Sequence, residues 1–120
     1  MKRILVAEDS PASLELLRTV LESAGYEVVE AVDGLDAVQK ASSNSVDLVL
    51  LDLQMPKMDG FAVLAELRKN ARFRTIPIIA LTASAMRGDR ERALEAGFSS
   101  YIAKPVNLAL LRSEVERLIR

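Results

Sequence analysis

The sequence predicts an α/β fold in which a doubly wound parallel sheet is covered by helices on both faces. Short apolar segments typical of strands alternate about five times with amphipathic segments typical of helices. Half of the 120 residues are hydrophobic, which is enough for one core, and the chain is too short for two. We therefore expect one domain over residues 1–120.

The predicted strands are short apolar segments bounded by turn residues or charged residues. In chain order they are residues 4–7, 28–31, 48–51, 78–81 and 99–103. The third segment is apolar without interruption, which is typical of a strand buried on both faces. Asp52 follows it directly, and Pro56, Asp59 and Gly60 then provide a turn and a helix entry. A carboxylate is therefore expected where a buried strand ends.

The helical segments are predicted from their apolar faces and from the residues at their ends. Ser10, Pro11 and Asn107 are suited to starting helices, and Gly25 and Gly97 to ending them. Asp33-Gly34 opens the second helix, residues 70–75 are the frayed end of the third, and residues 86–96 are helical by composition. The residues expected to face the core are, helix by helix, Leu14, Leu17, Leu21 and Ala24; Leu35, Val38 and Ala41; Phe61, Leu64, Ala65 and Leu67; and Leu108, Leu111, Val115 and Leu118.

The charge balance gives no general attraction to nucleic acid, because the formal net charge is -1. The candidate basic patch comprises Arg68, Lys69, Arg72 and Arg74, and such a run is typical of a solvated helix end and loop. We therefore expect no direct nucleic-acid binding.

The first apolar segment is too short for a signal peptide, since Glu8 and Asp9 interrupt it. No segment has the length and apolar character of a membrane span. These features favour a cytoplasmic protein without a membrane partner.

The chain contains neither cysteine nor histidine. These absences exclude disulfides, thiol nucleophiles and thiolate or imidazole metal sites, as well as the commonest general base. Catalysis must therefore use carboxylates, hydroxyls, lysine or a hard metal ion.

The predicted strands end in residues that can perform chemistry. Glu8-Asp9 follows the first strand and Asp52 the third, while Thr82 follows the fourth and Lys104 the fifth. If the winding direction reverses after the first strand pair, the first and third strands are neighbours and their carboxyl ends meet.

In that arrangement Glu8, Asp9 and Asp52 share one pocket. Three neighbouring carboxylates repel one another, and a divalent cation removes the repulsion. Oxygen ligands without histidine or cysteine favour Mg²⁺, with Mn²⁺ as an alternative.

This group of residues is suited to phosphoryl transfer onto a carboxylate. Asp52 is the predicted nucleophile, and it needs no base because a carboxylate is already ionised at neutral pH. Lys104 can pair with a phosphoryl oxygen, and Thr82 can donate a hydrogen bond from its hydroxyl.

The motifs together resemble the receiver domain of two-component response regulators. They comprise residues 4–9, the segment 51–60, Leu81-Thr82-Ala83 and residues 101–105, in this order. The resemblance covers essentially the whole chain. It implies a flavodoxin-like (βα)5 fold with a five-stranded parallel sheet in the order 2-1-3-4-5.

The resemblance also implies an Mg²⁺ site. Asp9 and Asp52 are expected to bind the ion directly, with the backbone carbonyl of Gln54 as a further ligand. Glu8 stands where the family often has aspartate, and it is expected to reach the ion largely through water.

The resemblance further implies how phosphorylation is read out. Asp52 would accept phosphate from a sensor histidine kinase or a phosphotransfer protein. Thr82 and Tyr101 match a switch pair, in which the hydroxyl moves to the phosphate and the aromatic ring turns inward. Lys104 matches the phosphate-binding lysine, and the Lys104-Pro105 peptide bond is expected to be cis.

The implied role is a signalling phosphoacceptor that catalyses its own phosphorylation and slow dephosphorylation, and not an enzyme with a separate substrate. The surface formed by residues 86–96, 99–103 and the last helix would control a downstream protein. A homodimer through the outer face of that helix is an alternative that the sequence leaves open. Gln54 and Ser84 occupy positions that set the lifetime of the acyl phosphate.

Three other functions are compatible with parts of this pattern. An aspartyl-phosphate phosphatase usually has a second acid two residues after its nucleophile, where this chain has Gln54. A receiver-like interaction domain without phosphorylation would not need the complete acidic set. A dinucleotide-binding domain lacks support because Glu8-Asp9-Ser10-Pro11 stands where a glycine-rich loop is expected.

Overall fold

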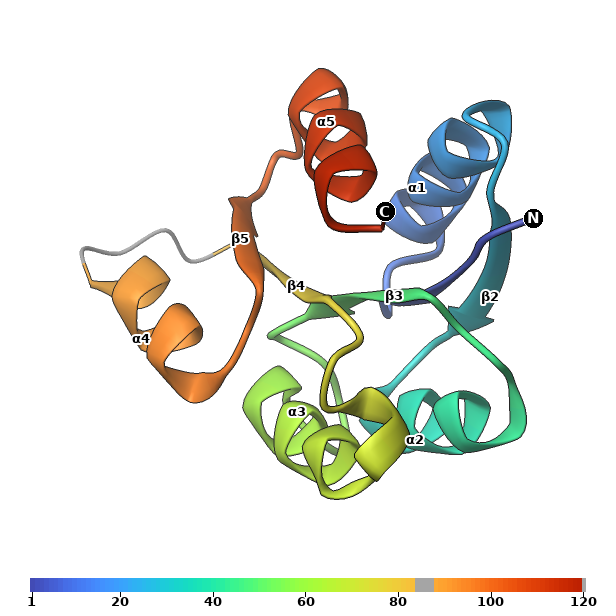
Figure 1. Ribbon diagram of the computed structural model, residues 1–120. Helices are drawn as coiled ribbons and strands as arrows, with labels where there is room; N and C mark the ends of the chain where they lie inside the picture. The colour runs from blue at the N-terminus through green and yellow to red at the C-terminus, as the bar shows by residue number, and fades with distance from the viewer. Residues whose placement is uncertain (84–87, 120) are drawn as a thin grey trace.

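The protein is a five-stranded parallel sheet with helices on both faces (Figure 1). A computed structural model describes residues 1–83 and 88–119. The strand order is β2-β1-β3-β4-β5, which confirms the predicted topology and the reversal of winding. The strands are β1 Arg3–Ala7, β2 Glu27–Ala31, β3 Leu48–Asp52, β4 Ile78–Thr82 and β5 Ser100–Ala103.

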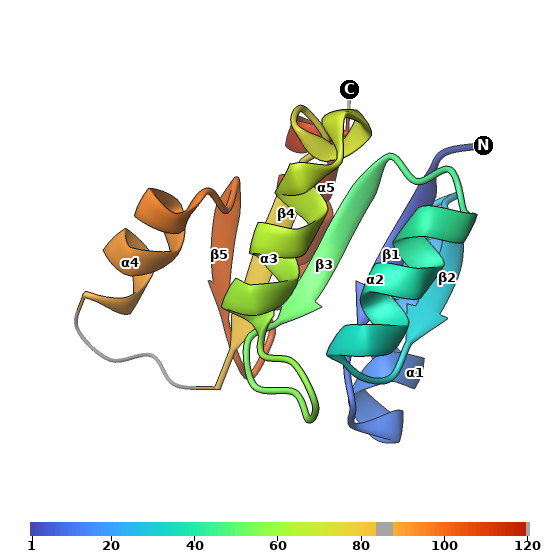
Figure 2. The same cartoon turned by 90° about the horizontal axis from the view of Figure 1, so that it is seen from below.

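The helices form two layers around the sheet (Figures 1 and 2). α1 and α5 cover one face, whereas α2 and α3 cover the other, with α4 beside β5. The helices are α1 Pro11–Ser23, α2 Gly34–Ser43, α3 Gly60–Lys69, α4 Asp89–Ala96 and α5 Leu108–Leu118, with a 3₁₀ turn, η1, at Ala71–Phe73. No helix in these described parts is long and apolar enough to cross a membrane.

The core lies in two clusters separated by the sheet. Leu5 and Leu51 belong to the cluster under α2 and α3, whereas Ile4 and Leu50 belong to the cluster under α1 and α5. Successive strand residues point to opposite faces, so a central strand covered on both sides buries every residue. All residues of β3 and β4 are buried, including the polar residues at their ends.

Several predicted helix ends are confirmed. The side chains of Ser10, Asp33 and Asn107 accept hydrogen bonds from backbone amides in the first turns of α1, α2 and α5. Gly25 and Gly97 follow helices with φ of 95° and 116°, a left-handed conformation that glycine adopts without steric cost. The predicted helix 86–96 begins at Asp89 in the described part of the chain, and residues 86 and 87 lie outside it.

The predicted inward face of α2 is confirmed at Ala41, and Val38 is partly buried against the core, but the prediction is wrong at Leu35. Leu35 is 47% exposed, and the buried residues are Gly34, Ala37 and Ala41. A Cβ atom on Gly34 would lie 2.2 Å from the carbonyl oxygen of Met58. The helix therefore begins with a glycine because its backbone approaches the loop after β3 closely at that position.

The predicted inward face of α3 is confirmed at Leu64 and Leu67, with Phe61 partly buried against the core, but it is wrong at Ala65. Ala65 is exposed, and Val63 is buried in its place beside Leu64 and Leu67. Residues 60, 63, 64 and 67 form one stripe at helical spacing. This stripe starts at Gly60, whose missing side chain allows contact with Leu53.

The segment after α3 is ordered by specific contacts and is not a frayed helix end. The Asn70 side chain accepts a hydrogen bond from the Arg72 amide and caps η1, and Phe73 is 1% exposed. Arg68 donates to the backbone carbonyls of Ile76 and Gly97, at 2.9 Å each, and to that of Phe73.

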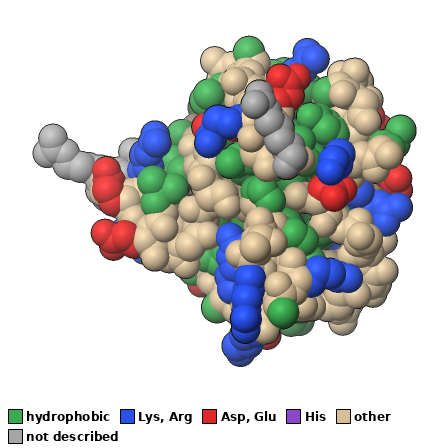
Figure 3. Space-filling view, viewed as in Figure 1, with side chains coloured by type: hydrophobic (Ala, Val, Ile, Leu, Met, Phe, Trp, Pro, Cys, Tyr) green, Lys and Arg blue, Asp and Glu red, His purple; other side chains and the backbone are tan. Residues whose placement is uncertain are grey.

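The predicted description of the basic patch as a solvated run holds for Lys69, Arg72 and Arg74, which are exposed, and is wrong for Arg68, which is partly buried and binds carbonyls as described above. The exposed Arg72 also donates to the carbonyl of Ala41. Figure 3 shows basic side chains gathered over α3 and the segment that follows it. At Arg68 and Arg72 the charges hold backbone segments together.

Candidate functional site

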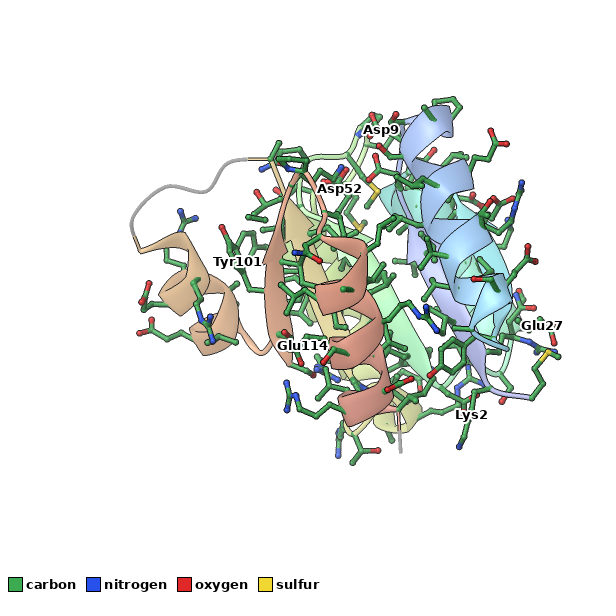
Figure 4. The ribbon with its side chains drawn as sticks, turned by 90° about the horizontal axis from the view of Figure 1, so that it is seen from above. Lys2, Asp9, Glu27, Asp52, Tyr101 and Glu114 are labelled. Carbon is green, nitrogen blue, oxygen red and sulfur yellow. The ribbon has the colours of Figure 1, made fainter. Side chains whose placement is uncertain are left out.

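The candidate site lies at the carboxyl ends of the central strands. Glu8 and Asp9 follow β1, and Asp52 is the last residue of β3. β1 and β3 pair in a register that places Ala7 beside Leu51, so Glu8 comes beside Asp52. Asp9 and Asp52 lie at one end of the molecule, away from Lys2 and Glu27 (Figure 4).

The carboxylates form a compact group. One oxygen atom from each of Glu8, Asp9 and Asp52 lies within 4.8 Å of the others. Glu8 and Asp52 are 1% and 2% exposed, whereas Asp9 is exposed. Hard oxygen donors on a partly open site are the ligands that Mg²⁺ prefers. These residues could therefore hold a metal ion, as predicted from the sequence.

Lys104 supplies the positive charge of the site. Its Nζ atom donates to Glu8 Oε2 at 2.6 Å and to Asp52 Oδ2 at 2.9 Å. Burial alone lowers the pKa of Lys104, but hydrogen bonds and attraction to the two carboxylates outweigh it and raise the pKa above its usual value. The ammonium therefore stays charged at neutral pH.

Glu8 has an environment that opposes its ionisation. Burial raises the pKa of its carboxyl group, although hydrogen bonds from Lys104 and from the amide of Ser10 act in the other direction. The nearby charge of Asp52 raises that pKa further. Burial dominates, so a single lysine does not fully compensate the two buried carboxylates.

Gln54 connects the third and fourth strands at the site. Its backbone N–H donates to Asp52 Oδ1 at 2.9 Å, and its side-chain Nε2 donates to Thr82 Oγ1 at 2.9 Å. Its Oε1 accepts from the amide of Ala83 at 3.2 Å. The sequence indicated a role for the Gln54 carbonyl, but nothing in it pointed to these side-chain contacts across 28 positions.

Tyr101 lies outside the acidic group. It is a half-buried residue of β5 that packs against the core cluster under α2 and α3. In the strand register Ala80 is opposite Tyr101 and Thr82 is opposite Ala103, so Tyr101 and Thr82 share one face of the sheet. Figure 4 shows the Tyr101 side chain on the side of β5 toward α4.

The peptide bond between Lys104 and Pro105 is cis, as the resemblance implied. Both residues also line a cavity of about 220 Å³ between α1 and the segment before α5. The cavity is mostly apolar, and its other lining residues are Ser13, Leu16, Leu17 and Val106. Ser84, which was predicted to influence phosphate lifetime, lies outside the described residues.

Comparison with known proteins gives a consistent family. The family model for the response regulator receiver domain matches residues 4–116. The polar-differentiation response regulator DivK of Brucella ovis is 37% identical over 107 residues, which are 89% of this chain and 87% of that protein.

Solved structures share the whole fold. The receiver domain of the sensor histidine kinase PA1611 from Pseudomonas aeruginosa, which has a magnesium ion coordinated in its active site cleft, is 40% identical. It superposes with a TM-score of 0.90, covering 98% of this chain and 97% of that one.

The chemotaxis protein CheY4 of Vibrio cholerae is 29% identical, with a TM-score of 0.91 and 98% of both chains covered. The family match, this shared flavodoxin-like fold and the grouped carboxylates agree with one another. The chain therefore belongs to the response regulator receiver domain family of two-component signalling.

Proposed function

We propose that this domain, residues 1–120, is an Mg²⁺-dependent phosphoacceptor that receives a phosphoryl group on Asp52. The supporting observation is the position of the Asp52 carboxylate, which is buried at a strand end, binds the Lys104 ammonium and lies close to the carboxylates of Glu8 and Asp9. A nucleophile held beside a cation and other carboxylates is suited to attacking an anionic phosphoryl group once the excess negative charge is neutralised.

The residues present fit a magnesium ion. Asp9 and Asp52 would bind it directly, Glu8 would do so through water, and the Gln54 peptide, which lies against Asp52, would offer its carbonyl oxygen. When bound, Mg²⁺ would neutralise negative charge on the transferring phosphoryl group. Mn²⁺ has a similar preference for oxygen ligands and is the alternative ion.

The transfer step follows from the chemistry of these residues. A carboxylate oxygen of Asp52 attacks phosphorus, the P–N bond to a donor histidine breaks, and the imidazole nitrogen keeps the electron pair and takes a proton. Lys104 pairs with a phosphoryl oxygen, and the Thr82 hydroxyl donates to another. Water later hydrolyses the acyl phosphate slowly.

The donor is a sensor histidine kinase or a phosphotransfer protein. The apolar cavity beside Lys104 supports this proposal, because a protein seated there would lie next to the lysine that binds Asp52. Leu16 lines the cavity and is 49% exposed, so it offers apolar surface to such a partner.

The output surface is formed by α4, β5 and α5. Tyr101 on β5 lies on the side toward α4 and shares a sheet face with Thr82, which supports a path from the site to this surface. Movement of Thr82 toward a phosphoryl group would allow Tyr101 to turn inward and change the surface seen by a downstream protein. A second copy of the chain is the alternative partner there.

The proposal is tested by intact mass after incubation with Mg²⁺ and acetyl phosphate. We expect one phosphoryl adduct that requires Mg²⁺ and is absent from Asp52→Asn. Asp47→Asn, directly before the other end of β3, is the matched control and keeps the adduct. Hydroxylamine sensitivity of the adduct identifies it as an acyl phosphate.

Two other results would contradict the proposal. A folded protein that forms neither an adduct nor an Mg²⁺-dependent beryllofluoride complex is an interaction domain independent of phosphate. Release of free phosphate over many rapid turnovers identifies an aspartyl-phosphate phosphatase.

A further inference from the structure

The side chain of Gln54 is bound to the end of β4 at two points. Its Nε2 atom donates to Thr82 Oγ1 at 2.9 Å, and its Oε1 atom accepts from the Ala83 amide at 3.2 Å. The backbone amide of the same residue donates to Asp52 Oδ1 at 2.9 Å. One residue therefore links the acceptor carboxylate to both polar groups at the end of the neighbouring strand.

These contacts restrict what the end of β4 can do. The amide hydrogen of Ala83 is directed to Gln54, so it cannot bind a phosphoryl oxygen without leaving that acceptor. Thr82 is 1% exposed, so water cannot easily replace the hydrogen bond that it accepts from Gln54. A buried polar group that loses a partner costs free energy unless a new partner takes its place.

We propose that the Gln54 carboxamide is a positioning residue that holds Thr82 and the end of β4 in their resting arrangement and competes with a phosphoryl group on Asp52 for the Ala83 amide. This inference rests on the proposed phosphoacceptor function. A phosphoryl group that takes the Ala83 amide has to displace the carboxamide oxygen of Gln54, so the carboxamide shifts the balance toward the resting arrangement.

Removal of the carboxamide should therefore strengthen binding of a phosphoryl analogue. Gln54→Met keeps a similar length and volume but cannot make either hydrogen bond. One or two lost hydrogen bonds of ordinary strength correspond to about three- to tenfold tighter binding. Gln39→Met is the matched control, because Gln39 is exposed on α2. This variant should bind the phosphoryl analogue with the same affinity as the original protein.

The measurement is a titration with beryllofluoride in saturating Mg²⁺, followed by ¹H–¹⁵N NMR. The same spectra give the exchange rate of the Ala83 amide, which should rise in ligand-free Gln54→Met because its acceptor is gone. A substitution that only loosened the fold would instead raise exchange throughout β4. Gln54→Ala is the second variant, in case the methionine packs poorly, and it should also bind more tightly.

The outcomes separate the inference from the function on which it rests. If the original protein forms no Mg²⁺-dependent complex, the phosphoacceptor function is wrong. If that complex forms but both Gln54 variants bind the analogue equally or more weakly, the carboxamide instead prepares the site for phosphate, and the inference is overturned. Tighter binding with faster Ala83 exchange supports it.

Discussion

The ammonium of Lys104 lies 2.6 Å from a carboxylate oxygen of Glu8, although the two residues are 96 positions apart. The same ammonium binds Asp52 at 2.9 Å. One cation is thus shared by two buried carboxylates, and negative charge is in excess before any metal ion binds. Because buried charge without full compensation costs free energy, the site reduces the stability of the metal-free protein.

Glu8→Gln should therefore stabilise the metal-free protein at neutral pH, by about 1 kcal/mol. The pKa of Glu8 is raised by burial, so its contribution to stability is present below its usual pKa and is lost as the pH rises through its raised pKa. Ionisation of this buried carboxyl group opposes folding, and glutamine removes the ionisable group. Chemical denaturation without Mg²⁺ measures the difference.

The control for this prediction is Glu15→Gln, since Glu15 is exposed on α1. It should change the free energy of unfolding by less than about 0.5 kcal/mol. Added Mg²⁺ should stabilise Glu8→Gln less than the original protein. Lower stability of Glu8→Gln in the absence of metal would show that the ion pair with Lys104 outweighs the burial of charge.

Gly34→Ala should destabilise the fold by about 2 to 4 kcal/mol, although alanine is the better helix former. A Cβ atom at this position meets the backbone of Met58 at 2.2 Å, so α2 or the loop after β3 has to move. Thermal unfolding of Gly34→Ala and of Gly25→Ala measures the loss of stability in each variant. Gly25 has open space around it and only the strain of a φ of 95°, so its replacement should cost about 1 kcal/mol. Equal losses would mean that the contact with Met58 relaxes easily.

Arg68→Met should lower the free energy of unfolding by about 3 kcal/mol. The guanidinium joins α3 to Ile76 before β4 and to Gly97 after α4, and methionine leaves those carbonyls without their charged donor. Lys69→Met is the neighbouring control, because Lys69 is exposed and pairs with Glu66 within the same helix. Its loss should stay under about 0.5 kcal/mol in urea denaturation. A similar small loss for Arg68→Met would indicate that water replaces the guanidinium.

Glu114→Gln should change how stability depends on pH. The hydrogen bond from Arg117 at 2.7 Å holds the pKa of Glu114 below its usual range, and Ser100 adds a second bond. A lowered pKa stabilises the fold above the usual glutamate range, and that contribution is lost as the pH falls through the lowered value. At pH 7 the free energy of unfolding of the original protein should exceed that of Glu114→Gln. The difference should be less than about 1 kcal/mol, because the Glu114–Arg117 pair is partly exposed. The melting temperatures of the two proteins, measured between about pH 7 and pH 3, should converge at the acidic end. A constant difference across this range would contradict the lowered pKa of Glu114.

The residues at strand ends were predictable from the sequence because a parallel sheet brings all its carboxyl ends to one edge. The positions of Asp52 and Thr82 at that edge follow from this rule alone. The inward face of α2 was not predictable in the same way. Hydrophobicity favoured Leu35, but the close approach of the Met58 backbone requires Gly34 at the start of the buried face, and that approach is a property of tertiary packing.

Arg68 and Gln54 illustrate a second limit of sequence reasoning. A basic residue near a helix end usually lies in solvent, and the carbonyls that Arg68 binds belong to segments distant in sequence. The Gln54 carboxamide likewise meets Thr82 and Ala83 only after β3 and β4 have paired. Side chains that bridge separate elements leave no local pattern.

The separation of Glu8 and Lys104 along the chain also affects the order in which the protein acquires its chemistry during synthesis. The acidic pair and Asp52 leave the ribosome long before the lysine that compensates them. A nascent chain that ends before β5 therefore carries the nucleophile without its cation. Such unfinished chains cannot build the complete phosphoryl site, so signalling competence is confined to molecules whose last strand has joined the sheet.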